Sequence, residues 1–290
     1  MNWTSTWRKT VEAPDCLALP LMKSSLRILL TDLKAALAIG QQDAIAASLD
    51  GLRQLPEVSG NQPLPDAFII QAILPVGELL ASPQVPASLL LTWQRDALAA
   101  VRAAAAAALS RRYLRGAEDL VDSVRRAGSD GRPEVRHALA QALGGAAAAD
   151  PARLLELGFS WTRPHKGGAE WPAAELRLCT TALAFLPALA ERYPERLLVT
   201  ALLLHRDLNP DVRSGLVGLL TRLAQSGQAV EVLDQLTAWA HEPEPNDWLI
   251  NKVLSGAWAK QHEARCTAIL ETLPDKTGGT TQSEAPDNVR

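Results

Sequence analysis

The sequence predicts an all-α fold built from stacked helical hairpins. Three observations predict it: a composition dominated by small and aliphatic helix formers, a repeated Pro-acid-Val-Arg segment, and the regular interval at which this segment recurs. Hydrophobic residues make up 47% of the 290 residues and aromatic residues only 4%, so Ala and Leu must supply most of the packing. Both residue types favour helices, and β-branched residues are sparse.

The clearest copies of the repeated segment lie at residues 132–136 and 209–213. In each copy, Pro occupies a first helical turn, where its missing N–H costs nothing, and an acid follows near the positive end of the helix. After Val212, apolar residues recur at the spacing of one buried helix face, at Leu216 and Leu219.

An apolar residue followed by Arg marks further copies. The pairs that begin at Val101, Val135, Leu176 and Val212 lie at intervals of 34, 41 and 36 residues. Equivalent positions extend the series to Leu26 and Phe68 upstream and to Trp248 downstream. A period in the upper thirties with two helices per period is typical of HEAT or armadillo stacking.

At these residues the chain resembles the HEAT-repeat (armadillo-like) α-solenoid family. The resemblance implies a right-handed α-α superhelix of about seven helical hairpins. The family carries an Asp in the turn and an Arg six residues later, and the matching pairs here are Asp96 and Arg102, Asp130 and Arg136, and Asp207 and Arg213. The resemblance implies that they form a ladder of hydrogen bonds between repeats. The copy at Arg177 departs from the pattern, with Trp171 at the Asp position.

The predicted domain organisation is an N-terminal extension at 1–20, the HEAT-like array at 21–273 and a disordered C-terminal tail at 274–290. Within the array, residues 56–66 have the composition of a loop. Residues 158–172, rich in Gly, Pro and Trp, account for the long interval of 41 residues and are predicted to be an insertion between the two helices of a hairpin.

Composition and cysteine spacing argue against several classes of protein. The formal net charge of -3 favours neither a nucleic-acid nor a membrane partner. Three widely separated cysteines do not form a disulfide framework or a zinc motif. We therefore expect buried thiols, no metal and no cofactor. The polar N-terminus is unlike a signal peptide and no long apolar run is present, so a cytoplasmic protein is expected.

Histidines and carboxylates provide little support for catalysis. His205 and Asp207 could orient one another near a turn, as acid–base catalysis requires. The simpler interpretation places Asp207 in the ladder and His205 at a helix end, where a cation favours the helix dipole. No nucleophile or phosphate-loop motif is present, so no catalytic residue is assigned.

Candidate partner-binding residues come from two groups. Trp161 and Trp171 lie in the predicted insertion, and Trp is enriched in interface hot spots, although both rings could instead cover the top of the hairpin. Trp93, Trp239, Trp248 and Trp258 have helical spacing and are expected in core or inter-repeat packing. The second group is Arg111, Arg112 and Arg115, within a basic cluster that could grip phosphates or an acidic partner, although a solvated face with internal ion pairs is the favoured interpretation. His137 could face the predicted concave surface.

Two functions follow from the resemblance. The first is a non-catalytic scaffold whose concave groove holds another protein or a peptide. The alternative is a DNA-binding HEAT-like protein, such as an alkylation-repair glycosylase, which the slightly acidic composition does not favour. A role as a partner of a cofactor-bearing protein is a third possibility that no residue supports. The fold alone cannot choose among them, because HEAT arrays serve many unrelated tasks.

Overall fold

The structure is a computed structural model that describes residues 18–55, 58, 63–163 and 171–273. Every regular element in these residues is a helix, so the all-α prediction is confirmed. The predicted tail at 274–290 and residues 1–17 of the predicted extension lie outside the described residues. So do residues 164–170 of the predicted insertion and most of the loop between 56 and 62.

The chain divides into two compact units, Met1–Leu189 and Ala190–Arg290, and the boundary falls inside the range 21–273 that the sequence predicts as one array. The helices of the first unit are α1 (Ala18–Ile39), α2 (Gln42–Arg53), α4 (Asp66–Phe68), η2 (Ile69–Ile73), α5 (Leu74–Leu80), α6 (Ala87–Trp93), α7 (Ala99–Leu114), η3 (Glu118–Leu120), α8 (Val121–Gly128), α9 (Pro133–Gly145), α10 (Pro151–Trp161), α11 (Ala173–Phe185) and η4 (Leu186–Leu189). Those of the second unit are α12 (Pro194–Leu204), α13 (Pro210–Leu223), η5 (Ala224–Gln228), α14 (Ala229–Ala240), α15 (Asp247–Leu254), η6 (Ala257–His262) and α16 (Glu263–Thr272).

In the first unit, α7 is the central helix and packs against both α5 and α9. Its alanine run, 103–108, is completely or almost completely buried. These small side chains allow a close approach of α5, in which a Cβ on Gly77 would lie only 2.6 Å from the Cβ of Ala107. The alanine run therefore brings α7 into close contact with α5.

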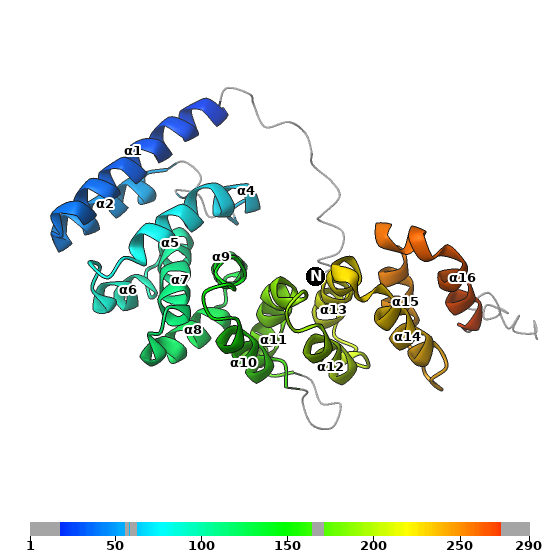
Figure 1. The fold of residues 1–290 in the computed structure, drawn as a ribbon. Helices are drawn as coiled ribbons and strands as arrows, with labels where there is room; N and C mark the ends of the chain where they lie inside the picture. The colour runs from blue at the N-terminus through cyan, green and yellow to red at the C-terminus, as the bar shows by residue number, and fades with distance from the viewer. Residues whose placement is uncertain (1–17, 56–57, 59–62, 164–170, 274–290) are drawn as a thin grey trace, which may run out of the picture. The chain divides into compact units, whose positions relative to one another are not determined.

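Alternate helices of the first unit pack on one another in two rows. Helix α9 contacts α7 on one side and α11 on the other, whereas α8 contacts α9, and α10 contacts α11. Figure 1 shows α8 and α10 on one side of this unit, with α9 and α11 on the other. Helix α10 continues to Trp161, so the predicted insertion at 158–172 is wrong for its first four residues, which are helical.

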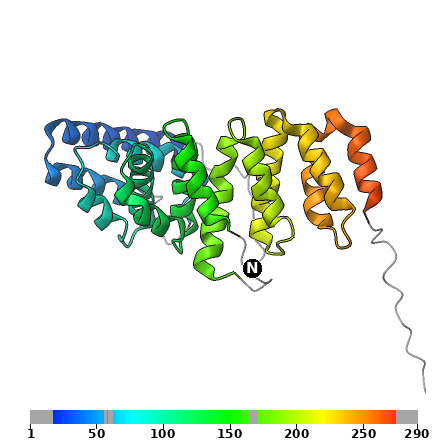
Figure 2. The same ribbon diagram turned by 60° about the horizontal axis from the view of Figure 1, so that its bottom comes forward.

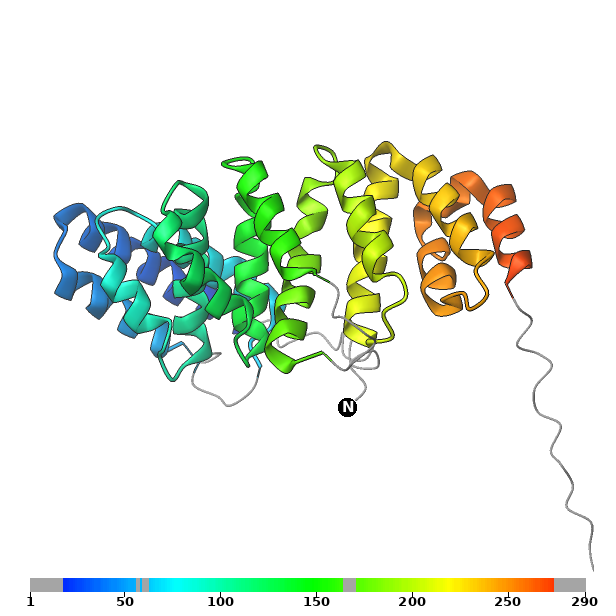
Figure 3. The same ribbon diagram turned by 90° about the horizontal axis from the view of Figure 1, so that it is seen from below.

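The second unit repeats this hairpin arrangement. Helix α13 packs against α12 and α15, and α14 packs against α16. Figures 2 and 3 show α12 to α15, coloured from yellow-green to orange, side by side in this unit. The buried face of α13 consists of Val212, Leu216, Leu219, Leu220 and Leu223, which confirms the face expected from the sequence period.

Two of the three cysteines, Cys179 and Cys266, are buried, as expected for structural thiols, and Cys16 lies outside the described residues. Burial also raises the pKa of the Cys266 thiol, which keeps it protonated at neutral pH. In the part of the chain that the structure describes, no helix is both long and apolar enough to cross a membrane.

Candidate functional site

Three turns of the structure share one local hydrogen-bond pattern. Asp96, Asp130 and Asp207 each accept, through Oδ1, the backbone N–H of the residue two positions later, at distances of 2.9, 2.8 and 2.8 Å. A helix begins three residues after each Asp, at Ala99, Pro133 and Pro210. An Asp side chain closes such a turn because its short carboxylate reaches the backbone two residues on. The Asp residues of the expected ladder therefore occupy equivalent positions in their hairpins.

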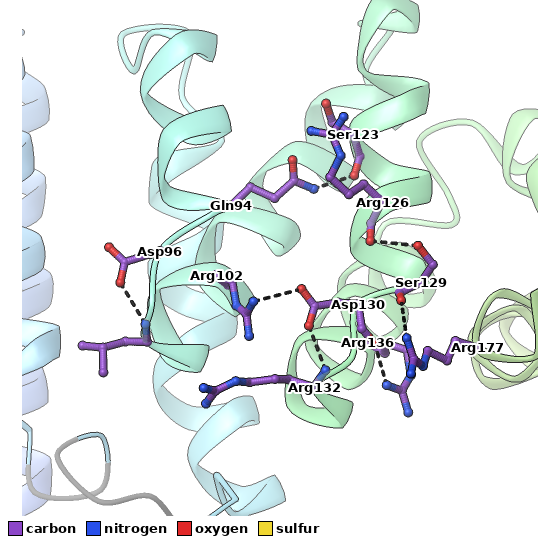
Figure 4. A network of polar contacts seen from close by, with 11 residues as sticks. Gln94, Asp96, Arg102, Ser123, Arg126, Ser129, Asp130, Arg132, Arg136 and Arg177 are labelled. Carbon is purple, nitrogen blue, oxygen red and sulfur yellow. Dashed lines mark hydrogen bonds and ion pairs between the residues drawn. The ribbon is translucent and has the colours of Figure 1, made fainter. Parts of the chain in front are cut away.

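The arginines of the ladder reach different partners. Arg102 Nη1 lies 3.5 Å from Asp130 Oδ2 of the next hairpin, the kind of rung that the resemblance implies (Figure 4). Arg136 instead donates through Nη1 to the backbone carbonyl of Asp130 in its own hairpin, at 2.8 Å. Asp96 is paired at 2.6 Å with Arg53 of α2, a residue that the sequence period did not identify.

At the C-terminal end of the series, Arg213 has an aromatic partner. Its guanidinium carbon lies 4.9 Å from the centre of the Trp248 ring, in the first turn of α15. Its Nε atom is buried and makes no hydrogen bond within the described residues. A guanidinium over an indole face is attracted by the ring quadrupole and remains available for further polar contacts. The contact holds Arg213 and Trp248 in a defined orientation.

This pair lines a groove of about 520 Å³ within the second unit, which we call the turn groove. It lies between the α12–α13 turn and the α14–α15 turn. Its lining residues are Arg206, Leu208, Arg213, Glu242, Pro243, Glu244, Pro245, Asn246, Asp247 and Trp248. Leu208 is 79% exposed and Trp248 is 38% exposed, so the groove presents apolar surface as well as charge to solvent. Its volume lies within the range of ligand pockets.

A buried histidine network supports the wall of the turn groove. His205 stacks on Trp239 with ring centroids 4.7 Å apart, its Nδ1 lies 2.7 Å from the carbonyl oxygen of Leu202, and its Nε2 lies 3.0 Å from Glu242 Oε1. Each ring nitrogen of His205 therefore faces an oxygen atom, one from the backbone of its own helix and one from the α14–α15 turn. Asn246 Nδ2 donates to the His205 carbonyl and ties the second turn to the first.

Glu242 carries the negative charge of this network. Burial raises its pKa, but hydrogen bonds from Arg206 and His205, with their positive charges, outweigh that effect and leave the pKa below its ordinary value. The carboxylate is thus held ionised beside Arg206 and His205. The partner of His205 is therefore Glu242 and not Asp207, which closes its own turn.

The three arginines predicted to grip a partner are used within the first unit. Arg111 forms an ion pair with Glu78 Oε2, and Arg115 reaches Glu78 Oε1 at 2.6 Å. Arg112 donates to the backbone carbonyls of Leu80, Ala81, Ser82 and Val85. The fork of Arg112 thus satisfies the last carbonyls of α5 and the turn that follows it. These side chains thus tie α7 to α5, with the internal ion pairs of the alternative interpretation, and partner binding by them stays a prediction.

The predicted role of Trp161 as a loop anchor is wrong in this structure, because Trp161 ends α10 and is 4% exposed. Its ring packs edge-on against Phe185 at 5.8 Å and covers Gly128, where a Cβ would lie 2.8 Å from the indole. Trp171 directly precedes α11 and is half-buried, and its partner-binding role stays a prediction. His137 is also half-buried, with Nε2 3.8 Å from Asp66 Oδ1.

Trp248 is the groove residue that the sequence did not single out for binding. Trp93, Trp239 and Trp258 lie in the core, at most 7% exposed, whereas Trp248 is 38% exposed and packs on Arg213 of the neighbouring hairpin. The buried residues of α15 are Leu249, Ile250, Val253 and Leu254. This spacing places position 248 on the side of the helix opposite the apolar face, a signal that was present in the sequence.

The chemistry available at the turn groove is recognition of charged and apolar groups. No group of three or more His, Cys, Asp or Glu side chains suited to a metal ion occurs within the described residues. A scan against protein-family models found no matching family, and searches of the curated proteins and of the solved structures found no match either.

Proposed function

We propose that this protein is a non-catalytic binding scaffold, built as a right-handed HEAT-like array of helical hairpins, that holds a peptide segment of another protein. The equivalent Asp turns at 96, 130 and 207 and the Arg102–Asp130 rung support the repeated array. Packing of each hairpin on the next is the arrangement by which such repeats bury their apolar faces.

The observation that carries the binding function is the composition of the turn groove. Trp248 and Arg213 are stacked together, and Leu208 stands almost fully exposed at the rim. Trp and Arg are the residues most enriched in interface hot spots, and a partly exposed Trp beside an apolar rim is costly to leave in water. A short peptide segment with one apolar or aromatic side chain fits this surface and volume.

The residues around the turn groove favour binding of a peptide without a change in the shape of the groove. Pro243 and Pro245 stiffen one wall, and Asn246 caps α15 by accepting the N–H of Leu249 at 3.2 Å. The His205–Glu242 pair ties this turn to the end of α12. A preformed groove loses little conformational entropy when a peptide binds, which raises affinity for a given contact area.

Selection of a displayed random-peptide library on the whole chain tests the proposal. Selected peptides should bind Trp248→Ala at least tenfold more weakly in calorimetric titration, because the ring forms the floor of the groove. Val230→Ala is the matched control, since Val230 is a 52% exposed apolar residue of α14 outside the groove. Peptides that bind both variants as tightly as the wild type would remove the turn groove from the proposal.

Nucleic-acid binding is a second candidate because of one feature of the first unit. The side chains of Arg102, Arg136 and Arg177 reach the turn at 129–132, and the side chain of Arg132 extends from this turn (Figure 4). Arg132 is exposed and could contact phosphate. Binding of duplex or single-stranded DNA would weaken steeply as salt rises, and Arg132→Gln would reduce that slope. No mobility shift at low salt would exclude this function.

A further inference from the structure

Helix α12 presents apolar residues on two opposite faces. One face, with Leu197, Ala201 and Leu204, is buried in the second unit. On the opposite face Val199, Leu202 and Leu203 are 49%, 46% and 56% exposed. A surface helix normally carries polar residues on its outer face, and a helix that is apolar all round is normally covered on all sides.

The exposed face continues into a charged residue at each end. Glu195 lies one turn before Val199, and Arg206 lies one turn after Leu202, and both are exposed. We call these five residues the α12 stripe: Glu195, Val199, Leu202, Leu203 and Arg206. Their spacing of three or four residues places them on a single face of the helix and its C-terminal extension.

We propose that the α12 stripe binds the same stripe of a second copy of this chain, in an antiparallel pair related by a two-fold axis. In such a pair each residue i that meets residue j is matched by j meeting i. Val199 then faces Leu202 of the second copy, and Glu195 faces Arg206 of the second copy. The acidic start and basic end of the stripe make it complementary to itself in this orientation only. A parallel pair would place Glu195 against Glu195 and Arg206 against Arg206.

Arg206 is already oriented for this contact. Its Nε donates to Glu242 Oε2 at 3.0 Å, which directs the side chain, and 71% of the side chain remains exposed. A guanidinium can donate to a second carboxylate at the same time, because it carries five N–H groups. Glu195 is in the first turn of α12, where a carboxylate is stabilised by the helix dipole.

The size of the stripe sets the strength of the expected dimer. Three half-exposed aliphatic side chains per copy cover less surface than the roughly 1,200–2,000 Å² of a standard interface. We therefore expect a weak, concentration-dependent dimer and no obligate one. The stripe is separate from the turn groove except for Arg206, so this proposal goes beyond the binding function proposed above and can fail independently of it.

Sedimentation velocity of the whole chain, from about 10 to 500 µM, covers the range of a weak dimer. The wild type should shift toward the dimer as concentration rises. Leu202→Lys and Glu195→Lys should each weaken the association at least tenfold, the first by placing a charge in the apolar centre and the second by repelling Arg206. The control Glu231→Lys makes the same charge change at an exposed glutamate of α14, outside the stripe, and should associate like the wild type.

Mixing two variants tests whether the charged ends of the stripe meet across the dimer. Glu195→Lys has a basic residue at both ends of the stripe and Arg206→Glu has an acidic residue at both ends, so each should repel its own kind. An equimolar mixture should restore association, since every end then meets the opposite charge. Circular dichroism checks that both variants fold. The new carboxylate of Arg206→Glu lies beside Glu242, and if this variant does not fold, the association of Glu195→Lys alone decides the outcome.

Three results would overturn the proposal. The first is a wild type that stays monomeric at the highest concentration. The second is a dimer that Leu202→Lys and Glu195→Lys leave intact, because the copies then meet through another surface. The third is a mixture that associates no better than its components, which would mean that the stripe is covered by a different partner.

Discussion

The contact between α5 and α7 makes a quantitative prediction for Gly77. A Cβ added at this position would lie 2.6 Å from the Cβ of Ala107 and 3.1 Å from the backbone oxygen of Ala104. Ordinary carbon contacts begin near 3.4 Å, so the two helices would have to separate by nearly 1 Å. Neither neighbour can rotate away, because one is a methyl group fixed to its helix and the other belongs to the backbone.

The expected cost of Gly77→Ala combines two opposing effects. Replacing a helical Gly by Ala stabilises a helix by about 0.5–1 kcal/mol, because the unfolded chain loses freedom. Overpacking a close contact costs about 1–3 kcal/mol. We therefore expect a net loss of about 1 kcal/mol, which corresponds to a fall of about 2–4 °C in the unfolding midpoint of a unit of this size.

Gly144→Ala is the matched control in the same unit, because a Cβ at Gly144 would make only ordinary contacts, at 3.6 Å with the Cβ of Ala188 and 3.9 Å with the backbone oxygen of Phe185. This variant should gain about 0.5–1 kcal/mol from helix propensity alone. Thermal unfolding followed by circular dichroism at 222 nm compares the two variants with the wild type. Equal stabilisation by both substitutions would refute the close approach of α5 and α7.

Three further substitutions test contacts described above. Glu242→Gln should lower stability at neutral pH, and the difference from wild type should shrink as the pH falls below the ordinary carboxyl value of 4.5. This sign follows from the lowered pKa of Glu242, because the ionised carboxylate stabilises the folded state above the unfolded pKa and this stabilisation is lost when the carboxylate is protonated. Denaturant titrations between pH 3 and 7 measure the difference in the free energy of unfolding between the variant and the wild type, and a constant difference would contradict the prediction. Arg112→Lys should destabilise the first unit by about 1–3 kcal/mol, since an ammonium group cannot donate to all four carbonyls that the guanidinium contacts. The control Arg132→Lys, at an exposed position, should leave the free energy of unfolding unchanged in the same assay. Trp161→Leu should cost about 2–4 kcal/mol by leaving a cavity beside Phe185, and an unchanged unfolding midpoint would mean that the indole is not part of the core.

The ladder shows how far a local pattern can predict a contact. The Asp of each pair closes its own turn, which depends on residues two positions apart and is readable from sequence. The Arg has a different partner in every copy: Asp130 of the next hairpin for Arg102, a backbone carbonyl of its own hairpin for Arg136, and the ring of Trp248 for Arg213. Those partners depend on how hairpins pack, which the repeat alone does not specify.

The misassigned side chains have a similar cause. A Trp in a Gly- and Pro-rich segment looks like an exposed anchor, yet α10 continues far enough to bury Trp161 beneath Gly128. Arginines close together in sequence look like a basic surface, yet the end of α5 supplies carbonyls and a carboxylate that bind them. In both examples the deciding neighbour is 27 or more residues away in the chain.

Sequence by itself determined the all-α fold, the buried face of α13 and the equivalent positions of the Asp turns. These follow from helix propensity, apolar period and turn chemistry, which act over a few residues. Tertiary structure alone decided that the first-unit arginines are satisfied internally, that Trp248 faces a groove and that α12 keeps an exposed apolar stripe. Exposure and pairing depend on which distant helix lies against a side chain, and packing settles that only when the whole chain folds.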